Sequence, residues 1–265
     1  MTIVKTLDAP GVLGEIVARK RMDLEKEGQC SPPLEPGERK EPVRNFEAAI
    51  RDGSLSLIAE YKRRSPSQGQ LTSSRTVQEV AIVYNRYASA ISVLCDGPYF
   101  DGGLHDLSAM RQVTHLPVLC KDFIISTEQV QSAYDAGADA LLLMASLLPV
   151  DSLNILLHEA KRYGLHALVE VHSQDELYSV LDTSAQIIGI NSRDLSTMKI
   201  DLDNVARLAR HIPSHLACVA ESGLHTQDDI NLITPHADAA LIGTSLMKAP
   251  DMTAALEGLG WTPCS

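Results

Sequence analysis

Short apolar runs alternate with amphipathic segments along most of this chain, and that alternation limits the folds available to it. Eight such runs are bounded by polar or turn-forming residues, and each is short enough for one buried strand. They cover residues 55–61, 90–96, 117–123, 139–145, 166–172, 186–192, 216–222 and 239–245. The segments between them have helical spacing, as in Val77, Val80, Ala81 and Tyr84. The order strand, helix, strand, helix is typical of a parallel sheet.

The size of this region favours a closed barrel over an open sheet. Eight strand–helix units in about 210 residues, with no linker between them, match a (β/α)8 barrel. We therefore predict an α/β protein whose single catalytic domain is a (β/α)8 TIM barrel over residues 51–265. An open Rossmann-type sheet is the alternative, but no G-x-G-x-x-G follows the first run.

Residues 1–50 have a different pattern. Residues 13–28 form an amphipathic segment with Leu13, Ile16 and Val17 on one side, and a Pro-rich stretch follows over residues 30–42. We predict an N-terminal helical extension packed on the barrel. It either packs on the domain surface, which we favour, or covers the active-site face.

Charge and cysteine usage limit the partners of the chain. Its 34 acidic and 23 basic residues give a net charge of -11, which argues against nucleic-acid or membrane binding. Its 5 cysteines form no C-x-x-C pair, so a reduced, metal-free, cytoplasmic protein is expected. The N-terminus lacks a signal-peptide pattern.

Polar residues gather where the runs end, and in a barrel of this type that edge carries the active site. Glu60 and Lys62 end the first run and point to the same side, while Lys121 ends the third and Glu170 the fifth. Each would be costly to bury unpaired. Further polar or small residues at these ends are Asn191, Arg193, Glu221, Ser222, Gly243 and Thr244. Their convergence predicts a catalytic site.

Two glycine-bearing ends predict a phosphate site. E-S-G at 221–223 and I-G-T-S at 242–245 end the last two runs, where such barrels often bind phosphate on backbone N–H groups. Ser65 and Lys62 lie on the neighbouring first run, so we expect an anionic small-molecule substrate. Two lysines in one pocket should lower each other's pKa. His172 either reaches this pocket or caps a loop, and we favour the loop.

Seven of these segments, in order, resemble the indole-3-glycerol phosphate synthase family. They are IAEYKRRSPS (58–67), ISVLCDGPYFDGG (91–103), VLCKDFII (118–125), LVEVH (168–172), IGINSRDL (188–195), VAESG (219–223) and LIGTSLM (241–247). The resemblance spans residues 8 to about 250. It implies a (β/α)8 enzyme that converts 1-(2-carboxyphenylamino)-1-deoxyribulose 5-phosphate to indole-3-glycerol phosphate. It further implies loss of carbon dioxide and water, with neither metal nor organic cofactor.

The resemblance also implies residue roles. Lys121 corresponds to the general acid of ring closure, Glu170 and Lys62 to the acid–base pair of dehydration, and Glu60 and Asn191 to groups that hold the lysines and the intermediate. The remaining implied positions are phosphate ligands and the lining of the substrate pocket. They are Ser65, Gly223, Gly243 and Thr244 for phosphate, and Phe100, Leu142, Arg193, Leu195, Glu221 and Ser222 for the rest of the substrate.

Two rival functions share the predicted barrel. A phosphoribosylanthranilate isomerase or another sugar-phosphate isomerase would not require two lysines at strand ends. A non-catalytic phosphometabolite sensor is expected to have lost Lys62, Lys121 or Glu170, and all three are present. For the oligomeric state we expect a monomer or a weak homodimer.

Overall fold

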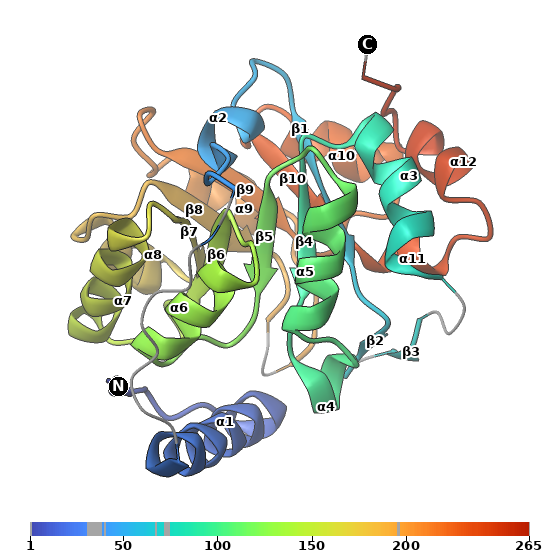
Figure 1. Ribbon diagram of the computed structural model, residues 1–265. Helices are drawn as coiled ribbons and strands as arrows, with labels where there is room; N and C mark the ends of the chain where they lie inside the picture. Colours follow the sequence, from blue (N-terminus) through green and yellow to red (C-terminus); the bar gives the residue numbers. More distant parts are fainter. Residues whose placement is uncertain are drawn as a thin grey trace.

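The computed structural model describes residues 2–30, 39, 41–66, 68–71, 75–194 and 197–264, with only the backbone of 27–30. Eight parallel strands close into a barrel in the order β1-β10-β9-β8-β7-β6-β5-β4 (Figure 1). The strands are β1 (Ser56–Tyr61), β4 (Ala90–Leu94), β5 (Val118–Lys121), β6 (Ala140–Met144), β7 (His166–Val171), β8 (Ile187–Asn191), β9 (Ala217–Glu221) and β10 (Ala239–Ile242). Each lies within one of the eight predicted runs, so the predicted (β/α)8 fold is confirmed.

Helices surround the barrel, and most of them bury one face against it. On α3, for example, Val80 and Tyr84 are fully buried, and a capping box between Thr76 and Glu79 fixes the start of the helix. The surrounding helices are α3 (Val77–Tyr87), α4 (Gly97–Phe100), α5 (Leu104–Val113), α6 (Thr127–Asp135), α7 (Val150–Arg162), α8 (Gln174–Leu181), α9 (Asp203–Ala209), α10 (Gln227–Ile233), α11 (Thr244–Lys248) and α12 (Met252–Gly258). No helix in the described ranges is long and apolar enough to span a membrane.

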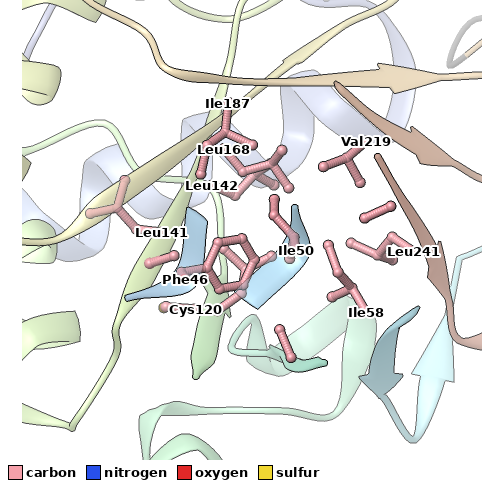
Figure 2. Packing of buried hydrophobic residues seen from close by; sticks show 14 of the residues in the cluster. Phe46, Ile50, Ile58, Cys120, Leu141, Leu142, Leu168, Ile187, Val219 and Leu241 are labelled. Atoms are coloured by element: carbon pink, nitrogen blue, oxygen red, sulfur yellow. The ribbon is translucent and has the colours of Figure 1, made fainter. Parts of the chain in front are cut away.

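Two short elements lie outside the predicted pattern. The helix α2 (Phe46–Ile50) precedes β1 and closes the amino-terminal end of the barrel. Figure 2 shows Phe46 and Ile50 among side chains of the strands, and both are fully buried. The hairpin of β2 (Arg64–Ser65) and β3 (Gly69–Gln70) extends the loop after β1 towards the opposite end.

A buried ionic network holds the chain before α2 against the barrel. Asp139, directly before β6, is fully buried and accepts hydrogen bonds from Arg111 Nη1 at 2.6 Å and Arg39 Nη2 at 2.9 Å. It also accepts from the backbone N–H groups of Arg44 and Val118. A buried carboxylate needs such compensation, because leaving it unpaired is costly.

The long helix α1 (Gly11–Cys30) lies at the end of the barrel opposite α2 (Figure 1). Its Arg19 pairs with Asp96 after β4 at 2.8 Å, and its Lys20 pairs with Asp122 after β5 at 2.6 Å. Ile16 is 2% exposed. The helix is therefore fastened over the carboxyl ends of β4 and β5. Most of the Pro-rich stretch that follows, residues 31–38 and 40, lies outside the described residues.

Candidate active site

A cavity of about 460 Å³ opens at the carboxyl ends of the strands, between the barrel and α1. Its lining includes nearly all of the predicted site residues. These are Glu60, Lys62, Ser65, Phe100, Lys121, Leu142, Glu170, Asn191, Arg193, Ser222, Gly223, Gly243 and Thr244. Leu195 lies outside the described residues. The strand ends thus converge on one pocket, as the barrel topology requires.

Lys121, at the end of β5, is surrounded by carboxylates. Its Nζ lies 2.5 Å from Glu221 Oε2, 3.7 Å from Glu60 Oε2 and 3.9 Å from Glu170 Oε2. Burial alone would lower the pKa of Lys121, but these three carboxylates outweigh it and raise the pKa above its ordinary value. The expectation that two neighbouring lysines would lower this pKa is wrong, because the carboxylates lie much closer to Nζ than the sequence indicates. Lys121 is thus held as an ammonium ion.

Lys62 and Glu60 form a second ion pair beside the first. Lys62 Nζ lies 2.5 Å from Glu60 Oε1, and Glu60 is 3% exposed. Burial raises the pKa of Glu60, but Lys62 and Lys121 together bring it below its usual value. Glu60 is therefore ionised and bridges the two lysines. The charge of both lysines is therefore compensated by carboxylates within this cluster.

Glu221, at the end of β9, lies beside Lys121. It is 1% exposed, its Oε2 contacts Lys121, and it is not among the residues that line the cavity, so its assignment as a substrate-binding residue stays a prediction. Burial raises the pKa of Glu221 to about 7, against the lowering effect of Lys121. Residues that line the cavity also lie at strand ends, so the sequence alone does not distinguish Glu221 from them. Glu221 positions Lys121.

Glu170, at the end of β7, is held by its neighbour on β8. Asn191 Nδ2 donates to Glu170 Oε1 at 3.1 Å, and Asn191 Oδ1 accepts from the backbone N–H of Arg193 at 3.0 Å. Glu170 is 3% exposed. Its other oxygen faces Lys121. One carboxylate thus lies between an amide donor and an ammonium group at the floor of the cavity.

Two glycines, Gly189 in β8 and Gly243 directly after β10, leave room for these carboxylates. A Cβ at Gly243 would lie 2.3 Å from Glu60 Oε1, and one at Gly189 would lie 2.2 Å from Glu221 Oε1. Gly243 has φ −132, so it is required by close approach and not by backbone conformation. The sequence associated Gly243 with phosphate alone. The structure gives it a second role, since any side chain there would displace Glu60.

The predicted phosphate ligands lie together at one end of the cavity. Ser222 and Gly223, after β9, both have positive φ, at 68° and 80°. Thr244 begins α11, so the first N–H groups of this short helix lie at the cavity wall. Ser65 is 6% exposed, and its Oγ has no hydrogen-bond partner among the described residues. These groups offer donors to an anion.

Several lining residues were not predicted as site residues. Leu13 and Ile16 of α1 lie in the wall, so this helix covers the cavity rather than only packing on the domain surface. Phe123 packs against Phe100 with ring centroids 6.0 Å apart, and His225 and Met198 also line the cavity. The amphipathic pattern of residues 13–28 indicated the apolar face of α1. Phe123, which ends the third run, carried no comparable signal.

Partly buried lysines and buried carboxylates lie at the carboxyl ends of the barrel strands, beside a group of backbone donors. This arrangement defines a (β/α)8-barrel enzyme that acts on a small anionic molecule. No group of three or more His, Cys, Asp or Glu side chains in the described part of the chain could hold a metal ion.

Comparisons with known proteins place this enzyme within one family. The family model for indole-3-glycerol phosphate synthase matches residues 13–259, and the chain belongs to that family. It is 40% identical over 263 residues to indole-3-glycerol phosphate synthase of Roseiflexus sp. (strain RS-1), covering 94% of this chain and 98% of that protein. It is 39% identical to the Geobacillus sp. (strain WCH70) enzyme of the same name, with 94% and 96% covered.

A solved structure agrees in fold. The 3-hexulose-6-phosphate synthase of Salmonella typhimurium superposes with a TM-score of 0.61 at 13% identity, over 77% of this chain and 96% of that one. At that identity the likeness concerns the barrel alone.

Proposed function

We propose that this protein is a carbon–carbon lyase of tryptophan biosynthesis. It would convert 1-(2-carboxyphenylamino)-1-deoxyribulose 5-phosphate to indole-3-glycerol phosphate, carbon dioxide and water. The observation that carries the proposal is the pair of ammonium groups, Lys62 and Lys121, that share the Glu60 carboxylate beside Glu170 in one cavity. Membership of the indole-3-glycerol phosphate synthase family supports the same reaction.

Ring closure is assigned to Lys121. The ring carbon that bears the carboxylate attacks the ketone carbon, and a new carbon–carbon bond forms as negative charge develops on the ketone oxygen. An ammonium donor there protonates that oxygen. The carbon–carboxylate bond then breaks, carbon dioxide leaves, and its electron pair restores the aromatic ring. Glu221 and Glu60 keep Lys121 protonated and in place for this step.

Dehydration is assigned to Lys62 and Glu170. The hydroxyl formed in the first step leaves as water after a proton from the Lys62 ammonium joins it. The neighbouring CH2 carbon, between the nitrogen and the former ketone carbon, loses a proton to Glu170. The electron pair of that C–H bond becomes the new double bond of the pyrrole ring. Asn191 keeps Glu170 oriented for this transfer.

The substrate's two ends match the two sides of the cavity. The phosphate would bind Ser65, Gly223, Gly243 and Thr244, where backbone and hydroxyl donors gather. The aromatic ring would lie against Phe100 and Leu142, and Arg193 would meet the carboxylate. Ser222 lines the polar part between them.

The proposal extends to the domain organisation and the cellular location of the protein. Residues 1–50 act as an extension of a single barrel domain over residues 51–265, a view supported by the contacts of α1 with the cavity. The protein would act in the cytoplasm, as a monomer or weak homodimer, without metal or organic cofactor.

The test incubates the purified protein with the carboxyphenylamino-deoxyribulose phosphate and follows indole fluorescence together with released carbon dioxide. We expect the two products in equal amounts. Binding without fluorescence would favour a non-catalytic sensor. Turnover of phosphoribosylanthranilate in place of this substrate would favour the isomerase.

A further inference from the structure

His172 lies directly after β7, two residues beyond Glu170, and its ring lies between two carboxylates. Nε2 is 3.4 Å from Glu170 Oε1, and Nδ1 is 3.4 Å from Glu176 Oε2 on α8. Both ring nitrogens are shielded from solvent, and neither makes a hydrogen bond in the described part of the chain. His172 does not line the cavity. Its ring is therefore placed to act on Glu170 and not on the substrate.

The backbone of His172 is fixed on both sides. Its N–H donates to Glu176 Oε2 at 2.7 Å, and its carbonyl accepts from Asn204 Nδ2 of α9 at 3.1 Å. Asn204 is 6% exposed and its own Oδ1 accepts from Arg207. These bonds fix the backbone of His172 at the β7–α8 corner, and the ring extends from this fixed point to Glu170.

The protonation state of the His172 ring follows from the carboxylates around it. A neutral imidazole has one N–H donor and one acceptor nitrogen, so in this site a lone pair would face a carboxylate oxygen. The imidazolium form presents an N–H to each carboxylate. The charged groups acting on the ring are Glu170 from β7, Glu176 from α8 and, further away, Glu221 from β9. Burial lowers the pKa of His172, but these carboxylates raise it above its ordinary value overall.

We propose that His172 is a positioning residue for Glu170: its imidazolium bridges Glu170 and Glu176, and so keeps the Glu170 carboxylate aimed at the cavity. Glu170 Oε1 then receives Asn191 and His172, while Oε2 remains free to face Lys121 and the substrate. The proposal rests on the assignment of Glu170 as the proton acceptor. It adds Glu176, outside the cavity, as the residue that sets the charge of His172.

The first test is the pH dependence of kcat/KM for the carboxyphenylamino-deoxyribulose phosphate. In His172→Gln the positive charge beside the Glu170 carboxylate is lost, so the acid limb of kcat/KM should move up by about one pH unit. Glu176→Gln should shift it in the same direction by less, because it weakens the charge on His172 and leaves the cavity intact. The matched control is His158→Gln on the exposed face of α7, with no shift.

The second test titrates the histidine rings of the wild-type protein. Imidazole NMR should show a His172 ring, assigned by its loss in His172→Gln, that stays protonated above pH 6.5. A ring that is already neutral at that pH overturns the proposal. So does a His172→Gln variant that turns over more slowly with the wild-type pH profile. A wild-type protein without turnover would instead overturn the proposed function, and the NMR titration would still decide the state of His172.

Discussion

At the residue scale, the cluster around Lys121 shows how a buried ammonium group is held charged. Three carboxylates, Glu60, Glu170 and Glu221, surround Lys121, and Glu60 also pairs with Lys62. Such a cluster is sensitive to removal of any single member, because the remaining charges are then buried without compensation. A substitution here therefore changes catalysis and stability together, and the two effects have to be measured separately.

The first prediction concerns Lys121→Met. Turnover should fall by about a hundredfold or more, which is the usual contribution of a general acid. The free energy of unfolding should also fall, by about 3–5 kcal/mol, because three carboxylates lose their shared partner. Adding Glu221→Gln should recover part of the stability and none of the activity, as measured by urea unfolding and by indole fluorescence. Recovery of activity in the double variant would show that Lys121 is not the general acid.

The second prediction concerns Glu170→Gln. Gln keeps the size of the side chain and can still accept from Asn191, so the dissociation constant of the substrate should change little. Turnover should fall by about a hundredfold, because an amide cannot take the proton released in dehydration. Stopped-flow fluorescence separates binding from turnover. Weaker binding with unchanged turnover would make Glu170 a binding group.

The third prediction concerns Gly243→Ala. The new Cβ would collide with the Glu60 carboxylate, so the lysine pair should be disturbed along with the phosphate site. Inhibition by inorganic phosphate and by a dephosphorylated substrate analogue should both weaken. A loss confined to inorganic phosphate would show that Glu60 moves aside freely. Gly258→Ala, where a Cβ meets nothing within 4 Å, is the matched control and should bind both ligands normally.

At the element scale, the sequence predicted the strands well and their ends less well. Apolar runs with turn signals locate all eight strands, since burial on both faces makes each run continuous. The side of a strand end that a residue faces depends on register, so Glu221 was predicted as lining although it is not among the residues that line the cavity. The five-residue helix α2 has too few residues for a periodic signal. The local sequence pattern thus predicts the strands, whereas tertiary packing decides which residues line the site.

The fourth prediction concerns the attachment of α1. Arg19 Nη2 lies 2.8 Å from both oxygens of Asp96, which is fully buried. Arg19→Met should loosen α1 and leave Asp96 unpaired, so that KM rises and trypsin cuts within α1 faster than in the wild type. Lys26→Met, at an exposed position on the same helix, is the control and should behave as wild type. Equal cleavage rates for Arg19→Met and wild type would contradict this role.

At the scale of the whole molecule, one short helix fills the amino-terminal end of the barrel. Phe46 of this helix is fully buried in the core and does not line the cavity. A substitution of Phe46 should therefore change the stability of the protein and leave its activity unchanged. The active site lies at one end, and the stabilising plug lies at the other.

The fifth prediction follows for Phe46→Ala. Loss of a fully buried phenyl ring should lower the free energy of unfolding by about 3–5 kcal/mol. Turnover below the melting transition should stay close to wild type, because the cavity is untouched. Thermal unfolding and indole fluorescence measure the two effects. Ile82→Ala, 67% exposed on α3, is the control, with a change within about 0.5 kcal/mol.

The seam of the barrel joins β1 to β10, from Ser56 beside Ala239 to Ala59 beside Ile242. During synthesis on a ribosome, one edge of β1 therefore stays unpaired until β10, the last strand, has been made. Until then the nascent chain exposes strand edges, which are templates for aggregation. Translation that stops before Ala239 yields an open sheet with edges at β1 and β9, and not a smaller stable barrel. Productive folding of this chain is consequently a late event that follows the emergence of nearly the whole polypeptide.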